Sequence, residues 1–454
     1  MSVSVPARIY ATLEIRPHKL LFTVLKVVGH KTMVVFQKTE NKKDFLNHNF
    51  VVNNVQQTAN KVKEFVDQYE RTHEGFQICK VALILPSEKI QIKEAYEKIN
   101  IALDDQPTPV TKDKIKQLKN VASAKPSTNQ NVILQSRSLS WSVDHMSAPL
   151  NRICQFSGKE LSAIFQNYEM NNAIVNSHHE VVEKANLTIL FLTHAINELY
   201  RVSVNPISKN ASTLIINWGE KQIEAGMFIE GIMKKHSVIP FGLNQVLETV
   251  AKQLKIKETI AETYLFNLLN FASNNFNDSL VLQTFSKIET YKKLVKYTGE
   301  ELKNIVTQTL NTQYEEIKSI FEIFSNAHEI ITYNFGSIQK IIGAEEVLKK
   351  GNAIASDYVF NEFFMGANNN YHLNIALGTV KSLEQLNNMK KEDEDLQTSV
   401  GIIPKQYAKP KNENTIFKSP LTLGGAQIQQ QGYFLMDEGI LIDKKPIYKK
   451  KRIG

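Results

Sequence analysis

Two short stretches of the chain carry residues whose types and spacing could do chemistry. Near the N-terminus, LEIRPHK sets the acid Glu14 ahead of the amine Lys19, which together have the groups needed for acid and base catalysis. Near the middle, NWGEKQIE sets Asn217 and Glu224 on either side of a turn that contains Lys221. Ionisable residues at a strand end or turn are usually surface or paired groups. We therefore do not expect Glu14 and Lys19 to form a catalytic pair by themselves.

The sequence contains no conventional catalytic or metal-binding motif. H-E-x-x-H, C-x-x-C, G-x-S-x-G, Walker A and G-x-G-x-x-G are all absent. His178 and His179 are adjacent, so on a helix their side chains point about 100° apart and cannot share a metal ion. We expect them to be a solvated pair and predict no metal site.

Hydrophobic patterning predicts the elements that position these residues. RIYATLEIRPHKLLFTVLKVV and HKTMVVFQKTE are typical of neighbouring strands, a helix follows with Val55, Ala59, Val62 and Val66 on one face, and CKVALILP is a further strand. This order predicts a mixed sheet with helices packed on it. STLIINWGEKQIEAGMFIEG predicts a buried strand, a tight turn at Trp218-Gly219 and a second strand.

The second half of the chain is predicted to end in a helical region, a strand and a tail. Residues 258–329 are expected to be largely helical, EIITYNFG is expected to be a strand that ends in a turn, and the chain beyond Leu386 is expected to be a flexible tail. One apolar stripe of the helical region is expected to face the core: Tyr314, Ile317, Ile320, Phe321 and Phe324.

Composition bounds the possible functions. The chain has 454 residues, of which 42% are hydrophobic, so one large two-lobed fold or two to three domains can form. Two cysteines indicate a reducing compartment, and no signal sequence or membrane span is found, so we expect a cytosolic protein. Lys and Arg exceed Asp and Glu by 54 to 46, and half of this surplus lies in the tail. Without interleaved aromatic and basic residues in the body, nucleic-acid binding is not expected.

Two similar blocks, each with three strands and a helix, begin near Arg8 and Thr213. This is the organisation of the α/β actin-like fold, shared by actin, heat-shock chaperones and sugar kinases, in which hairpin turns from both lobes meet nucleotide phosphates. The arrangement from Arg8 to about Ser382 resembles the FtsA family of bacterial cell-division proteins. HSVIPFGLNQVLETVA is similar to a stretch of that family, and four of its residues fit: Pro240, Gly242, Asn244 and Ala251.

A second block, ILQSRSLSWSVDHMSAPLNRICQFSGKEL, is similar to the subdomain inserted in FtsA proteins. Six residues keep the residue types and the spacing of that subdomain: Val143, Asp144, Asn151, Gly158, Lys159 and Leu161. The resemblance implies a first lobe at 1–85 and 166–208, an inserted subdomain at 86–165, a second lobe at 209–246 and 325–386, a helical subdomain at 247–324 and a tail at 387–454.

The turns that bind ATP in the family are altered here. Pro17 stands in the first phosphate turn and has no N–H to offer, and Asn217 and Glu220 occupy the second, where an acid and a glycine are expected. Leu265 stands where the family has a nucleoside-binding Lys. The resemblance implies a vestigial ATP site at Glu14, Lys19, Asn217, Gly219, Glu224, Gly242, Glu262 and Gly336. We expect no ATPase activity and no cofactor, although Lys19, Lys221 and Arg16 leave weak binding of ATP and Mg²⁺ open.

The resemblance implies an adaptor that links FtsZ filaments to the cytoplasmic membrane at the division site, binds the FtsZ C-terminal tail through the helical subdomain, and associates with itself into filaments. Six basic residues near the C-terminus are expected to bind an anionic membrane surface: Lys444, Lys445, Lys449, Lys450, Lys451 and Arg452. The alternative is that these basic residues contact only solvent and bind no membrane. Alternatives for the function are a PilM-type actin-like assembly protein and an ATP-dependent enzyme or chaperone of the same superfamily.

Overall fold

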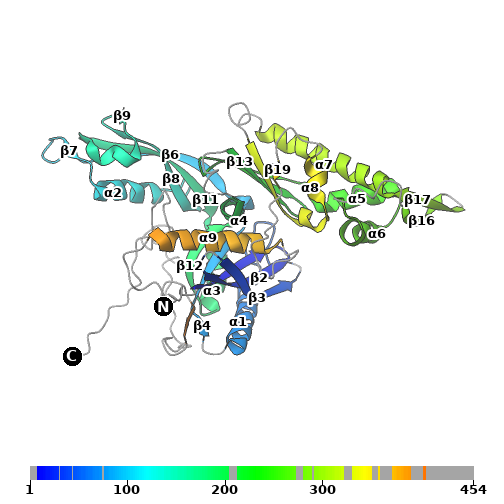
Figure 1. Ribbon diagram of the computed structural model, residues 1–454. Helices are drawn as coiled ribbons and strands as arrows, with labels where there is room; N and C mark the ends of the chain where they lie inside the picture. Colours follow the sequence, from blue (N-terminus) through cyan, green and yellow to red (C-terminus); the bar gives the residue numbers. More distant parts are fainter. Residues whose placement is uncertain are drawn as a thin grey trace, which may run out of the picture. The chain divides into compact units, whose positions relative to one another are not determined.

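The computed structural model describes residues 8–29, 31–42, 44–73, 76–203, 212–271, 280–288, 291–321, 330–349, 356–357, 371–389 and 402–404. The chain divides into two compact units (Figure 1). Unit 1 comprises Met1–Ala195 with Thr379–Gly454, and unit 2 comprises Ile196–Gly378. The predicted ends of the first and second lobes, at 208 and 386, stay predictions.

Unit 1 is built on a mixed five-stranded sheet in the order β12-β5-β1-β2-β3. β1 pairs antiparallel with β2 and β2 with β3, whereas β5 runs parallel to both β1 and β12. The predicted mixed sheet is therefore confirmed. Its strands are β1 (Arg8–Arg16), β2 (Lys19–Val28), β3 (Lys31–Asn41), β5 (Lys80–Leu85) and β12 (Thr188–His194).

Two helices of unit 1, α1 (Val55–Thr72) and α3 (Asn172–Lys184), pack against each other. The Asn54 side chain accepts a hydrogen bond from the Gln57 N–H and begins α1, a favourable N-cap. Val62 and Val66 are buried on its inner face, as their spacing predicts. A further helix, α9 (Leu373–Met389), belongs to unit 1 from Thr379 onward and runs past residue 386, after which the tail was predicted to begin.

A second sheet of unit 1 has the order β6-β11-β8-β9 and a core of its own, in which Trp141 and Phe165 make an edge-to-face contact. Helix α2 (Lys112–Ser123) packs on it. The predicted inserted subdomain ends at residue 165, whereas β11 of this sheet runs on to Asn171. The strands, with a small separate pair, are β6 (Gln91–Asn100), β8 (Asn131–Val143), β9 (Met146–Ser147), β11 (Glu160–Asn171), β7 (Thr108–Pro109) and β10 (Ser157–Gly158).

Unit 2 repeats the strand plan of unit 1. Its sheet has the order β15-β14-β13-β18-β19, with antiparallel pairs from β13 to β15 and parallel pairs from β13 to β19. The two similar blocks predicted from the sequence are thus present. The strands are β13 (Ser212–Trp218), β14 (Ile223–Ile229), β15 (Ile232–Ile239), β18 (Ile330–Gly336) and β19 (Ser356–Asp357).

The predicted helical region of unit 2 also contains a β-hairpin. Strands β16 (Leu280–Ile288) and β17 (Tyr291–Thr298) pair antiparallel, so the expectation of largely helical structure is wrong over these residues. Tyr314, Ile317 and Phe321 of the apolar stripe are buried; Phe324 lies outside the described residues. The helices are α4 (Ala195–Ser203), α5 (Leu243–Leu254), α6 (Glu258–Thr263), α7 (Gly299–Phe321) and α8 (Ala344–Lys349).

Candidate functional site

The tight turn between β13 and β14 is closed by its own backbone. Gly219 donates its N–H to the Gln222 carbonyl oxygen at 2.8 Å. A Cβ added at Gly219 would lie 2.6 Å from that oxygen, so the turn requires glycine. The predicted strand, turn and strand are therefore present, and the single glycine kept in the turn has a structural reason.

The first turn of α5 packs directly on this turn. The Leu243 N–H donates to the Gly219 carbonyl oxygen at 3.0 Å, and the Asn244 N–H donates to that of Glu220 at 2.9 Å. The third helical N–H, from Gln245, donates to the Gly242 carbonyl oxygen at 3.1 Å. A helix N-terminus binds anions through these donors. Here all three are already paired within the chain.

Gly242 is fixed at the junction of turn and helix. Its N–H donates to Oε1 of Gln245 at 2.7 Å. A Cβ at Gly242 would lie 2.5 Å from the Glu220 carbonyl oxygen, so only glycine allows this approach. The resemblance to the FtsA family pointed to Gly242 as a nucleotide residue, and its contacts here are with backbone.

The turn after β18 joins the same cluster. Gly336 has a left-handed φ of 86°, and a Cβ there would lie 2.2 Å from the Trp218 carbonyl oxygen. The next residue, Ser337, donates its hydroxyl to that oxygen at 2.9 Å. Lys340 reaches the Glu220 carboxylate at 3.3 Å. Three turns that are distant in sequence therefore meet in unit 2.

Behind the turns, a few polar groups are buried in a hydrophobic core and pair with one another. Trp218 donates its indole N–H to Oδ1 of Asn334 at 3.0 Å, and the hydroxyl of Tyr314 donates to the same oxygen. Burial raises the pKa of Tyr314 well above its usual value, so the hydroxyl stays protonated as a donor. Glu224 is buried and is held by Asn217 and by His236, whose Nε2 lies 2.8 Å from it.

Glu14 and Lys19 belong to unit 1, where they flank the Pro17-His18 turn. The Glu14 carboxylate pairs with Nε of Arg16 at 2.6 Å, so the guanidinium expected to attract phosphate already has an anion beside it. The carbonyl oxygens of Pro17 and His18 accept N–H groups from Phe45 and Lys42. In the register of β1 and β2, Lys19 lies opposite Arg16.

The structure brings together four of the eight residues assigned to the vestigial ATP site, and a fifth is tied to them by Asn217. Asn217, Gly219, Gly242 and Gly336 cluster at the turns, and Glu224 pairs with Asn217 across β13 and β14. Glu262 is exposed on α6, and no described contact links it to the turns. Residues that the sequence analysis did not single out hold the cluster together: Gln245, Asn334, Ser337 and His236. The position of Gln245 three residues after a helix N-cap was the available signal.

Several donors that could bind the phosphates of ATP are already used within the chain. Phosphate needs free backbone N–H groups. Those of Gly219 and of the first turn of α5 are used within the chain, and the Glu220 side chain adds a negative charge. Across the described ranges, histidine, cysteine and acidic side chains nowhere gather in a group of three or more that could bind a metal ion.

The expectation of a solvated histidine pair is wrong. His178 is fully buried on α3, and its Nδ1 lies 2.9 Å from the Ile174 carbonyl oxygen. Burial lowers the pKa of His178 to about 4. Burial also lowers the pKa of His179 to about 4. His179 is only partly buried, and its Nδ1 lies 3.5 Å from the Glu183 carboxylate.

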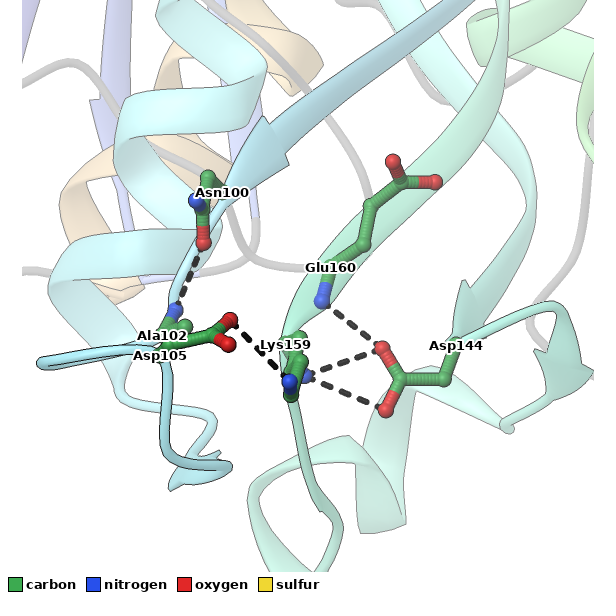
Figure 2. Close-up of polar contacts among 6 residues, drawn as sticks. All are labelled: Asn100, Ala102, Asp105, Asp144, Lys159 and Glu160. Atoms are coloured by element: carbon green, nitrogen blue, oxygen red, sulfur yellow. Dashed lines mark hydrogen bonds and ion pairs between the residues drawn. The ribbon is translucent and has the colours of Figure 1, made fainter.

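In the segment that resembles the inserted subdomain, the Asp144 carboxylate fixes the spacing of the residues around it (Figure 2). The side chain of Asp144 accepts the N–H of Lys159 at 2.9 Å and that of Glu160 at 2.8 Å. A Cβ at Gly158 would lie 2.4 Å from Cγ1 of Val143, which explains the glycine. Lys159 also pairs with Asp105 at 3.0 Å. The spacing of Val143, Asp144, Gly158 and Lys159 is therefore a structural requirement.

The predicted membrane residues, from Lys444 to Arg452, lie outside the described residues. Among the helices that the structure describes, none is long and apolar enough to cross a membrane.

Solved structures of low sequence identity resemble this chain. The PilM-PilN type IV pilus biogenesis complex matches with a TM-score of 0.52 and 12% identity, over 83% of this chain and 98% of that chain. The ethanolamine utilization protein EutJ from Carboxydothermus hydrogenoformans has a TM-score of 0.43 and 11% identity, over 83% and 90% of the two chains. MreB5 of Spiroplasma citri bound to ADP has a TM-score of 0.43 and 12% identity, over 83% and 98%.

No protein-family model matches the sequence, and no curated protein matches it. At these identities a likeness shows the fold alone. The chain therefore has the predicted α/β actin-like fold, and the FtsA-type identity of the inserted subdomain stays a prediction.

Proposed function

We propose that this chain is an actin-like assembly protein that acts as an adaptor without depending on bound nucleotide. The proposal is carried by the closure of the three turns in unit 2: the N–H groups of Gly219, Leu243 and Asn244 all donate to carbonyl oxygens of the same cluster. Binding of a phosphate there would have to break these bonds and place its charge beside Glu220. An actin-like scaffold held in this way is suited to binding other proteins.

The finer form of the proposal is an FtsA-like adaptor. It links FtsZ filaments to the inner face of the cytoplasmic membrane at the division site and associates with itself into filaments. Its support is the spacing kept around Asp144 and Gly158 and the fit at Gly242, each of which has a structural reason in this chain.

The helical part of unit 2 offers a surface for the partner's tail. A shallow, open hollow lies along one face of α7, within the range predicted to bind the FtsZ tail. Amide and hydroxyl side chains can pair with the backbone of an extended peptide. The hollow is lined by Asn304, Thr307, Gln308, Asn311, Thr312 and Glu315.

A PilM-type assembly protein is the second form, and the match to the PilM-PilN complex over 98% of that chain favours it. On this alternative the partner is a PilN-type protein instead of FtsZ. The two forms share the scaffold and the independence from nucleotide, and they differ in the partner that binds.

The test is a titration of the full-length chain with two labelled peptides, one with the sequence of the FtsZ C-terminal tail and one from a PilN-type protein, followed by fluorescence anisotropy. Micromolar binding of the FtsZ tail supports the FtsA-like form, and binding of the PilN peptide alone supports the second form. For the hollow on α7, Gln308→Ala should weaken FtsZ-tail binding, whereas Glu316→Ala, exposed on the same helix, should not. Binding of neither peptide would refute both adaptor assignments.

A further inference from the structure

A short strand lies inside the region expected to be a flexible tail. β20 (Ile402–Pro404) pairs antiparallel with β4 (Phe76–Ile78), a strand between α1 and β5 in unit 1. The two form a separate two-stranded sheet (Figure 1, beside the label β4). Residues 402–404 therefore dock on a strand edge of unit 1.

Only one residue pair of the two strands can exchange backbone hydrogen bonds in both directions. In β4, the Phe76 N–H donates to the His73 carbonyl oxygen at 3.3 Å, and the Ile78 N–H donates to Oε1 of Glu70 at 2.9 Å. In β20, Pro404 has no N–H. The register pairs Gln77 with Ile403, and these two residues keep both N–H groups available for the ladder.

The β4 edge also exposes one large apolar side chain. Phe76 is one of few large hydrophobic side chains exposed among the described residues, at 36%, and in the register it lies opposite Pro404. Exposed strand edges with apolar residues pair readily with an added strand. A two-stranded sheet of this length has marginal stability by itself. What favours the pairing is that both strands belong to one chain, which gives β20 a high effective concentration near β4.

We propose that the β4 edge is a strand-docking site for an extended apolar-apolar-proline segment of a partner protein, and that residues 402–404 are its built-in, displaceable occupant. The site thus couples capture of a partner strand to release of residues 402–404 from β4. The proposal does not depend on whether the partner of the hollow on α7 is FtsZ.

The first test is competition in the full-length protein. The probe is a labelled peptide with the sequence of residues 399–407, SVGIIPKQY. Ile403→Pro removes the N–H that β20 contributes to the ladder, whereas Ile403→Val keeps it. We expect Ile403→Pro to bind the peptide at least tenfold more tightly than the wild type, and Ile403→Val to bind it like the wild type. Equal binding by Ile403→Pro and the wild type would overturn the proposal.

The second test identifies the site. In the Ile403→Pro background, Gln77→Pro should abolish peptide binding and Gln77→Ala should preserve it; binding that survives Gln77→Pro lies elsewhere and overturns the proposal.

A hydrogen-exchange measurement needs neither the peptide nor a substitution in β4. The Gln77 amide should exchange at least tenfold faster in Ile403→Pro than in Ile403→Val, and an unchanged rate would show that β20 does not occupy the edge.

Discussion

The hydroxyl of Ser337 donates a 2.9 Å hydrogen bond to the carbonyl oxygen of Trp218, and this bond ties the turn after β18 to the end of β13. The same hydroxyl lies 3.0 Å from the Gly219 carbonyl oxygen. Two turns that could open toward a nucleotide are therefore bound to each other. The account of the function follows from this closure.

Gly336 should be intolerant of a side chain. Gly336→Ala should lower the free energy of unfolding by about 2 to 4 kcal/mol, because the added Cβ meets the Trp218 carbonyl oxygen and the left-handed φ is strained. Gly29→Ala is a matched control: φ is 60° there, nothing lies within 4 Å of the added Cβ, and the cost should be about 1 kcal/mol. Urea denaturation measures both, and equal costs would contradict the packing described.

The carboxylate of Asp144 should hold the loop at Lys159 in place. Asp144→Ala should cost about 1 to 3 kcal/mol, because it removes the acceptor of two backbone N–H groups and leaves alanine with a φ of 48°. Asp144→Asn should cost less, since it keeps an acceptor oxygen and asparagine tolerates this φ.

Hydrogen exchange checks this clamp at the amides of Lys159 and Glu160, which should exchange faster in Asp144→Ala. Asp105→Asn is the control, because it breaks only the surface pair with the Lys159 side chain at 3.0 Å and should change stability by about 1 kcal/mol or less. If the two amides exchange equally fast in the wild type and in Asp144→Ala, the clamp does not exist.

The buried His178 should make stability depend on pH. Its pKa is about 4 in the folded chain against 6.5 for an unperturbed histidine. As pH falls from 6.5 toward 4, the unfolded chain binds a proton that the folded chain does not, so the free energy of unfolding should fall by up to about 3 kcal/mol. Above pH 6.5 this contribution is constant. His178→Asn should show a shallower loss between pH 6.5 and 5 in urea denaturation, and an unchanged pH profile would contradict burial of a neutral His178.

The basic C-terminal residues should bind anionic membranes. Six charges at about 1 kcal/mol each give at most about 6 kcal/mol, weakened by salt. Replacing Lys444, Lys445, Lys449, Lys450, Lys451 and Arg452 by glutamine should abolish co-sedimentation with vesicles that contain phosphatidylserine. Neutral phosphatidylcholine vesicles are the control. Equal sedimentation of the variant and the wild type would support the alternative of a solvated basic end.

Strand patterning and turn residues were enough to predict the mixed sheets and the repeat of the strand plan. Trp218, Gly219 and Gly336 fall at the ends and turns expected for them. The hairpin of β16 and β17 was missed because tertiary contacts, and not local periodicity, decide whether a short apolar run becomes strand or helix.

The roles of the turn residues were harder to predict than their positions. The substitutions at Pro17 and Glu220 indicated poor phosphate binding, but the sequence could not show that Ser337 and Gln245 would close the turns, since these contacts join segments distant in the chain. Likewise, the pairing of β20 with β4 depends on an edge that only the folded unit presents.

Isothermal titration of the full-length protein with Mg-ATP tests the central claim most directly. Because the N–H groups of Gly219, Leu243 and Asn244 are paired within the chain, we predict no saturable binding at millimolar Mg-ATP, and FtsZ-tail binding that is the same with and without nucleotide. Saturable micromolar binding of Mg-ATP, or partner binding that requires it, would contradict the claim that the turns are closed to nucleotide.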